Sequence, residues 1–175
     1  MVPGMNNGDD MKIRISRLSE GLHEYHFSSD PSEIGLENNF KKAVEVDVTL
    51  DKASRQMYLK SDIRSSGLFQ CDRCLAELEQ FVSCHFNMFY VYDELDTGSH
   101  PADEVQVISP DTVYIDLTED VRQMVTLAVP LKLLCKDDCK GLCPRCGTNW
   151  NHQSCSCNAE VDDSRWEGLR DAINN

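Results

Sequence analysis

The chain is short of basic residues. Its 175 residues include 17 Lys and Arg against 30 Asp and Glu, a formal net charge of −13 at pH 7. Proteins that bind duplex nucleic acid broadly need clustered Lys and Arg to displace counterions from the phosphates. An acidic chain of this kind can therefore contact nucleic acid only through a local basic patch.

Long apolar runs and a secretory leader are also missing. Apolar residues make up 41% of the chain, enough for a globular core, but no run is long enough to span a bilayer. The opening residues 1–10 are polar and rich in Gly and Asn, rather than charged and then apolar. We therefore expect a soluble cytoplasmic protein with no membrane partner.

Common enzyme signatures are absent as well. The sequence has no G-x-S-x-G motif, no P-loop and no Gly-rich dinucleotide fingerprint. It also shows no recognisable set of clustered acidic ligands that would hold Mg²⁺ for a nuclease. We predict that the protein is not an enzyme and has no small-molecule substrate.

What the chain does have is nine cysteines, eight of them in four short pairs. Such closeness suits a metal, because Zn–S bonds are about 2.3 Å long and one ion takes four ligands. A reducing cytosol keeps thiols free unless a metal claims them, and an odd count fits disulfides poorly. The paired cysteines are Cys71, Cys74, Cys135, Cys139, Cys143, Cys146, Cys155 and Cys157.

The ninth cysteine, Cys84, has a different setting. It lies in the segment 80–92, where Val82, Phe86 and Tyr90 occupy the same side of an expected strand. A buried free cysteine behaves as a small hydrophobe, so we interpret Cys84 as a core residue. Eight ligands then remain, enough for two closed structural zinc sites with Zn²⁺ in each.

The spacing suggests how the ligands are shared. Cys143-Pro-Arg-Cys146-Gly147 is typical of a zinc knuckle, because Gly lets the backbone turn toward the sulfurs. Cys155 and Cys157 follow closely and can complete one site. Cys135 and Cys139 would then share a second site with Cys71 and Cys74, which would staple the C-terminal segment to the sheet.

Other arrangements stay open. The four cysteines from Cys135 to Cys146 could form one local site and leave the last pair to join the upstream pair, and His152 could replace a cysteine. Iron–sulfur clusters also take four thiolates, but the C-P-x-C-G knuckle favours zinc. A thiol redox protein is an alternative for the C-x2-C pairs, although redox pairs open a helix and Cys71 and Cys74 lie between expected strands.

Alternating apolar residues predict an antiparallel β-rich fold, with strands at 11–16, 44–50, 57–63, 80–92, 105–108 and 112–117. Helical spacing follows, with Thr118 as the expected N-cap and Pro130 ending the helix. The acidic segment 93–104 is expected to be a solvated loop. The fold class is α+β: an antiparallel β-rich domain with one packed helix, then a C-terminal cysteine-rich zinc-binding segment and a short helix.

The expected organisation has three parts. Residues 1–10 form a flexible N-terminus, 11–134 the β-rich domain with its helix, and 135–175 the zinc-binding segment with a terminal helix docked on it. A local basic patch lies around the C-terminal cysteines, where only Asp137 and Asp138 oppose it. Its members, which are candidates for contact with RNA or a protein partner, are Lys132, Lys136, Lys140 and Arg145.

Several motifs occur together in a fixed order: Cys71-Asp-Arg-Cys74-Leu75, the stretch 116–130, the knuckle 139–147 with a later Cys-x-Cys, and Asp163-Ser-Arg-Trp-Glu-Gly-Leu. In this combination the chain resembles the YceD family, described as large ribosomal RNA subunit accumulation proteins, over about residues 40–175. The resemblance implies a bacterial cytoplasmic factor that supports accumulation or processing of large-subunit (23S) ribosomal RNA.

Two classes of partner suit an acidic factor of this kind. A zinc-stapled module could contact pre-ribosomal RNA or a large-subunit ribosomal protein through the basic patch. Alternatively, the acidic surface could attract a basic ribosomal protein and escort it without direct RNA contact. The overall charge favours the escort, and the local charge favours RNA.

Overall fold

The computed structural model describes residues 11–36, 38–98 and 101–157. Its internal contacts divide the chain into a β-sheet unit, residues 1–69 and 78–131, and a Cys-rich unit, residues 70–77 and 132–175. The short segment 70–77, which links two long strands, thus belongs with the C-terminal residues. The expected flexible N-terminus and terminal helix lie outside the described residues.

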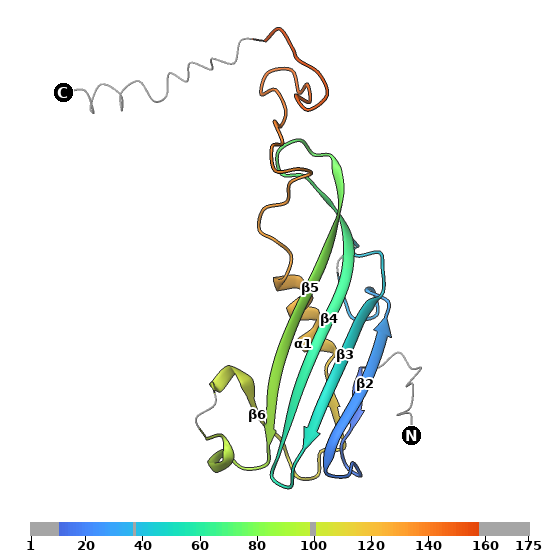
Figure 1. The fold of residues 1–175 in the computed structure, drawn as a ribbon, viewed down its shortest axis with the longest axis vertical. Coiled ribbons are helices and arrows are strands. Elements are labelled where there is room, and N and C mark those ends of the chain that lie inside the picture. The colour runs from blue at the N-terminus through green and yellow to red at the C-terminus, as the bar shows by residue number, and fades with distance from the viewer. Residues whose placement is uncertain (1–10, 37, 99–100, 158–175) are drawn as a thin grey trace, which may run out of the picture. The chain divides into compact units, whose positions relative to one another are not determined.

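The main sheet of the β-sheet unit has five strands in spatial order of the sequence (Figure 1). They are β2 (Gly21–Ser29), β3 (Val44–Lys52), β4 (Gln56–Gln70), β5 (Glu77–Val91) and β6 (Val105–Val107). The pairs β2–β3 and β3–β4 are antiparallel, whereas β6 runs parallel to β5. Between β5 and β6 the chain forms two short 3-10 helices, Glu94–Asp96 and Ala102–Glu104, in the segment expected to be a solvated loop.

A second, two-stranded sheet pairs β1 (Lys12–Arg14) with β7 (Tyr114–Asp116), placing Ile13 opposite Ile115. Helix α1 (Thr118–Leu127) follows directly. Its N-cap is Leu117 rather than the expected Thr118, and the Asp116 carboxylate accepts the Thr118 N–H at 3.0 Å. The Asp116 carboxylate thus satisfies one of the free N–H groups at the start of the helix, while the N-cap residue itself offers no side-chain acceptor. Among the described residues, no helix is long and apolar enough to cross a bilayer.

The core lies between one face of the main sheet and helix α1, which covers that face (Figure 1). Alternate residues of β3 point inward and meet their neighbours on β4, with Val46 opposite Ile63 and Leu50 opposite Leu59. Val121 and Val125 of α1 are fully buried against them. Cys84 is partly buried against the same core, as its alternation predicted, and burial raises the pKa of its thiol.

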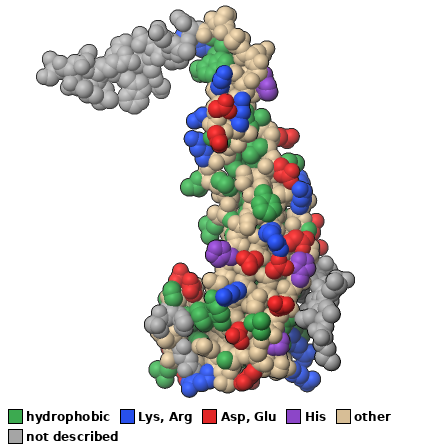
Figure 2. Space-filling view, viewed as in Figure 1, with side chains coloured by type: hydrophobic (Ala, Val, Ile, Leu, Met, Phe, Trp, Pro, Cys, Tyr) green, Lys and Arg blue, Asp and Glu red, His purple; other side chains and the backbone are tan. Residues whose placement is uncertain are grey.

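The opposite face of the sheet is polar, as expected where strands alternate. Charged side chains of both signs lie on this face together with histidines (Figure 2). His26 contacts Glu45 at 3.1 Å and Asp47 at 2.8 Å, and Arg64 pairs with the same aspartate.

The sheets, the helix and the cysteine groups together confirm the predicted α+β class: a mostly antiparallel β domain with one packed helix and cysteine clusters toward the C-terminus.

A pair of Leu→Ala variants tests the position of the core. Leu59 is fully buried on β4, whereas Leu127 at the end of α1 is 78% exposed. Leu59→Ala should lower the free energy of unfolding by about 2–5 kcal/mol, because it leaves a cavity, and Leu127→Ala by less than about 1 kcal/mol. Urea denaturation followed by far-UV circular dichroism measures both, and equal losses would contradict the described core.

Candidate metal centres

The eight paired cysteines form two groups of four within the Cys-rich unit. Centre A comprises Cys71, Cys74, Cys135 and Cys139. Centre B comprises Cys143, Cys146, Cys155 and Cys157. Within each group all four Sγ atoms lie within 4.8 Å of one another. The structure thus forms the grouping favoured from the spacing, and His152, which is exposed, belongs to neither group.

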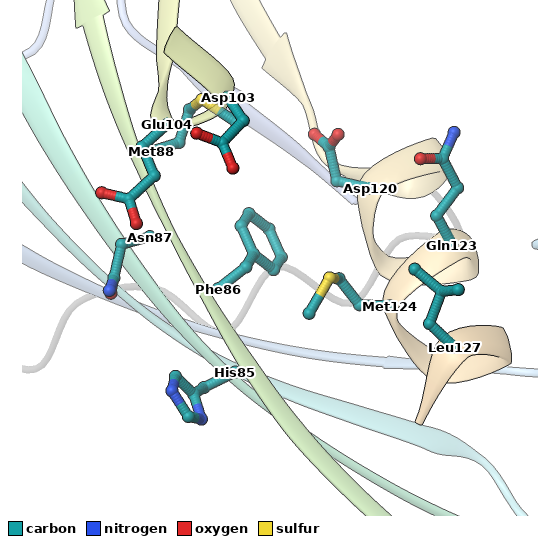
Figure 3. Close-up of a pocket in the computed structure, with 10 residues that line it drawn as sticks. All are labelled: His85, Phe86, Asn87, Met88, Asp103, Glu104, Asp120, Gln123, Met124 and Leu127. Atoms are coloured by element: carbon teal, nitrogen blue, oxygen red, sulfur yellow. The ribbon is translucent and has the colours of Figure 1, made fainter. Parts of the chain in front are cut away.

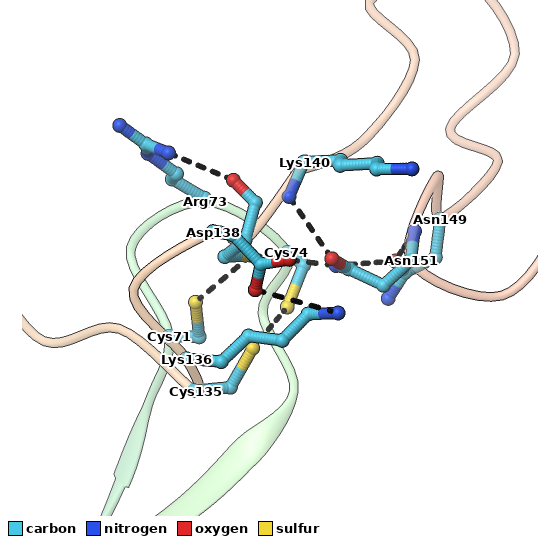
Figure 4. Close-up of polar contacts among 10 residues, drawn as sticks. Cys71, Arg73, Cys74, Cys135, Lys136, Asp138, Lys140, Asn149 and Asn151 are labelled. Atoms are coloured by element: carbon cyan, nitrogen blue, oxygen red, sulfur yellow. Dashed lines mark hydrogen bonds and ion pairs between the residues drawn. The ribbon is translucent and has the colours of Figure 1, made fainter.

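The sulfur positions of centre A suit a tetrahedral metal. Cys71 Sγ lies 3.8 Å from Cys139 Sγ, and Cys74 Sγ lies 3.5 Å from Cys135 Sγ. Four sulfurs bound tetrahedrally at about 2.3 Å would be about 3.8 Å apart, whereas a disulfide requires about 2.05 Å. Figure 4 shows the side chains of Cys71, Cys74 and Cys135 converging from two chain segments. The donor set therefore fits Zn²⁺ and would leave no coordination position open.

Hydrogen bonds join the two segments that supply centre A. Asp72 donates its backbone N–H to the Leu133 carbonyl at 2.8 Å, and Leu133 N–H returns to the Asp72 carboxylate at 2.6 Å. Arg73 Nη1 donates to the Cys139 carbonyl at 2.7 Å. Gly141 has φ +77°, and a Cβ there would come within 3.1 Å of the Arg73 carbonyl. Close backbone contact thus accompanies the convergence of the sulfurs.

The two C-x-R-C loops share one backbone turn. In each, the residue after the second cysteine donates its N–H to the carbonyl of the first at 2.9 Å. That residue is Leu75 at φ 58° in centre A and Gly147 at φ 72° in centre B. A left-handed conformation costs a non-glycine residue about 1–2 kcal/mol, so the surroundings of Leu75 must impose it. The Cys71 N–H, which donates to the Ala76 carbonyl at 2.9 Å, closes that turn.

Two neighbouring residues of the turn 149–151, Trp150 and Asn151, each donate to a sulfur of a different centre. The Asn151 side-chain amide donates to Cys139 Sγ of centre A at 3.3 Å, while its Oδ1 accepts the Lys140 N–H at 2.9 Å. The Trp150 indole N–H donates to Cys155 Sγ of centre B at 3.4 Å. Donors to a ligating sulfur stabilise its thiolate form and orient it toward the metal. One short turn therefore positions ligands in both centres.

Without a metal, the thiols within each centre differ widely in pKa. Burial raises the pKa of Cys71, but backbone N–H groups from Cys135, Arg73 and Cys74 outweigh it and lower that pKa to about 6. The hydrogen bond to Cys74, with burial, raises the pKa of Cys135 to about 12. In centre B, Thr148 lowers the pKa of Cys146 to about 6, whereas the hydrogen bond to Cys146 raises that of Cys157 to about 12.

The difference in pKa among the thiols of one centre has a physical cause. Four thiols within 4.8 Å cannot all ionise without a counter-charge, so some keep their protons while others become thiolates. A divalent cation supplies that counter-charge and releases the remaining protons. The chemistry of the donor set therefore also fits a bound metal.

The predicted basic patch is exposed, and its members differ in their contacts. Lys136 forms an ion pair with Asp138 at 3.7 Å, and the backbone N–H of Lys140 is tied to Asn151. Figure 4 shows Arg73, Lys136 and Lys140 around centre A. Sequence reasoning missed Arg73, although it holds the same position in Cys71-Asp-Arg-Cys74 as Arg145 does in the second knuckle.

Metal loading would change the charge of the Cys-rich unit. Its described residues carry five Lys and Arg against four Asp and Glu, a small positive excess. Each centre with four thiolates and one Zn²⁺ adds a formal −2, so two loaded centres reverse the sign. Any attraction for phosphate must therefore come from individual exposed cations rather than from the charge of the unit as a whole.

Comparison with known proteins gives a consistent family match. A model described as "Large ribosomal RNA subunit accumulation protein YceD" matches residues 59–171. The chain is 26% identical over 161 residues to an uncharacterized protein of Mycobacterium tuberculosis, a match that covers 89% of this chain and 76% of the relative. No solved structure matches the chain.

Two plant relatives match shorter parts. Both carry the name "Large ribosomal RNA subunit accumulation protein YCED homolog 1, chloroplastic". The Arabidopsis thaliana protein is 35% identical over 60 residues, which is 34% of this chain and 19% of that protein. The Zea mays protein is 43% identical over 44 residues, which is 25% of this chain and 15% of that protein.

Double variants test how the cysteines are shared. The described grouping places Cys71 and Cys135 in one centre and Cys135 and Cys143 in different centres. Cys71→Ser with Cys135→Ser should therefore remove one zinc ion, whereas Cys135→Ser with Cys143→Ser should remove both. Native mass spectrometry counts the ions. The reverse pattern would support the local partition of Cys135 to Cys146, and a wild-type chain without metal would favour the thiol redox alternative.

Substitutions in the 149–151 turn test the sulfur donors. Asn151→Asp keeps the acceptor for the Lys140 N–H but replaces the donor to Cys139, and Trp150→Phe removes the donor to Cys155. Each should weaken zinc binding at its own centre by about 10–100-fold and change the other by less than about threefold. Competition with a chromophoric chelator, in variants that retain one centre only, measures each affinity. Equal weakening of both centres by either variant would refute the assignment.

Proposed function

The chain belongs to the YceD family of large ribosomal RNA subunit accumulation proteins, and on this premise we propose that it is a non-enzymatic factor in biogenesis of the large ribosomal subunit. It supports accumulation or processing of 23S ribosomal RNA in the cytoplasm as a zinc-stapled binding module. The observation that carries this proposal is the pair of closed four-sulfur groups. Such groups suit structural zinc, because a catalytic zinc keeps one position open.

Direct contact with pre-ribosomal RNA is the first candidate activity. The exposed cations of the Cys-rich unit support it. Each of the four lies within three positions of one of the paired cysteines in the sequence and faces solvent: Lys132, Lys136, Lys140 and Arg145. Zinc fixes the backbone that presents them, so fewer degrees of freedom are lost when RNA binds. In this role the metal organises a surface and takes no part in a reaction.

Escort of a basic ribosomal protein is the second candidate. The formal net charge of −13 favours it, because an acidic surface attracts cationic chains and keeps them from phosphate. The reversal of charge that accompanies metal loading of the Cys-rich unit supports the same partner. The two candidates use different residues and can be separated by substitution.

A charge-matched pair of variants tests RNA contact. Changing Lys132, Lys136, Lys140 and Arg145 to Ala should abolish most binding to a 23S RNA fragment while both zinc ions are retained. If each cation neutralises one phosphate of single-stranded RNA, the slope of log K against log salt should fall by about 3. The control changes four exposed cations of the β-sheet unit to Ala: Arg14, Arg17, Lys41 and Lys60.

The control should retain the salt slope of the wild type. Equal losses in the two variants would mean that only net charge matters, and absence of wild-type binding would eliminate direct RNA contact. In that case, specific capture of a large-subunit ribosomal protein by the zinc-loaded chain would support the escort.

A further inference from the structure

The β-sheet unit contains a pocket of about 370 Å³, and none of its lining residues belongs to centre A or centre B. It lies between β5, the 3-10 helix Ala102–Glu104 and helix α1 (Figure 3). Pockets of this size fall within the range that binds ligands or single side chains of a partner. We call it the acidic pocket, after the carboxylates described below.

One part of the acidic pocket is apolar. Phe86 of β5 and Met124 of α1 are half-buried against the core and face the same space (Figure 3). Leu127, in the last turn of α1, also lines the pocket and is 78% exposed. Three neighbouring apolar side chains that open to water offer surface whose burial would stabilise a bound partner.

The other part is anionic. Asp103 and Glu104 enter from the 3-10 helix and Asp120 from α1, and no Lys or Arg lines the pocket. Figure 3 shows these carboxylates near one end of the pocket, away from Leu127. In the described part of the chain, the structure shows no hydrogen bond or ion pair for these three carboxylates. Burial, together with the charges of Glu119 and Asp116, raises the pKa of Asp120, which marks a carboxylate without a compensating cation.

Glu119, the acidic residue next to Asp120 on α1, already has hydrogen-bond donors for its carboxylate. Glu119 accepts hydrogen bonds from Arg122 at 2.5 and 2.9 Å and from Gln123 at 2.7 Å, which hold its pKa at about 2. Arg122, the one Lys or Arg of α1, is thus already engaged by Glu119, the residue before Asp120. Besides these carboxylates, His85 is the titratable side chain among the residues that line the pocket, so a Lys or Arg facing the carboxylates would come from another molecule.

We propose that the acidic pocket binds a basic segment of a protein, in which a Lys or Arg faces Asp103, Glu104 and Asp120 and an adjacent apolar side chain covers Phe86, Met124 and Leu127. A Lys or Arg suits both parts, because its stem packs on apolar surface while its charged end meets carboxylates. Phosphate would be repelled by the same carboxylates, so RNA does not fit. This inference deepens the escort proposed above and rests on it.

Peptide binding to the full zinc-loaded chain tests the pocket. One fluorescent probe is a short peptide of Lys, Arg and Leu, and its companion has Ser in place of each Leu at the same charge. Fluorescence anisotropy should show tighter binding of the Leu peptide, because only that peptide covers the apolar part. Equal affinity for the two peptides would contradict the proposal.

A charge-matched pair of triple variants locates the binding. Asp103→Asn, Glu104→Gln and Asp120→Asn together should weaken the Leu peptide by about tenfold. Glu20→Gln, Glu24→Gln and Asp51→Asn make the same change in net charge at exposed positions elsewhere and should weaken it by less than about threefold. Equal loss in both triples would mean attraction by overall charge alone and would overturn the proposal.

Leu127→Ser provides a second variant that should fold, because this side chain is largely exposed. It should weaken the Leu peptide more than the Ser peptide, whereas an equal effect on both would contradict the apolar contact. Competition by spermidine at the peptide's own concentration would assign the pocket to small polyamines, and direct binding of a fluorescent RNA oligonucleotide that Leu127→Ser weakens would assign it to RNA. Either result would overturn the proposal.

The pocket and the escort can fail separately. If the peptide does not bind but the chain still captures a ribosomal protein, the pocket assignment fails and the escort stands. If the peptide binds as described but no ribosomal protein is captured, the pocket stands and the escort fails.

Discussion

The convergence of four sulfurs in centre A is the constraint on which the Cys-rich unit depends. Its close sulfur pairs join residues 61 and 68 positions apart in the sequence, and closing such a loop costs conformational entropy. The unit has little apolar core to offset that cost, since its buried apolar residues, within the described part, are the cysteines Cys71, Cys74, Cys139 and Cys143. A described unit of fewer than 40 residues ordinarily needs a metal or disulfides to fold, and in the proposed account a metal bound by the eight cysteines would supply that energy.

The β-sheet unit has no such dependence. Its apolar cluster draws residues from both sheets and from helix α1, as in an ordinary layered domain. The two units also differ in the chemistry that they present, because exposed cations surround centre A while the acidic pocket lies in the β-sheet unit. Ribosomal particles consist of anionic RNA and basic proteins, so these two surfaces match the two classes of component that the proposed function involves.

Sequence reasoning predicted the strands whose apolar residues alternate, the helix, and the exclusion of Cys84 from the two groups of four cysteines. The resemblance to the YceD family is confirmed by the match over residues 59–171. Strand β2 was missed because it is an edge strand with few buried residues, and the parallel pairing of β6 depends on a return path that no local pattern encodes. The acidic pocket was also missed, because Asp103 and Asp120 belong to separate elements and no local sequence pattern shows that they line one pocket. Similarly, spacing alone does not indicate that Asn151 donates to Cys139.

The central claim is that metal in two four-sulfur centres folds the Cys-rich unit, while the β-sheet unit folds on its own core. Two-dimensional amide NMR of the ¹⁵N-labelled full chain, recorded before and after zinc removal under reducing conditions, tests this most directly. Chelation should collapse the dispersed signals of residues 70–77 and 132–157, leave most signals of the β-sheet unit in place, and be reversed by adding zinc. Retention of dispersed signals from the Cys-rich unit without metal would contradict the account.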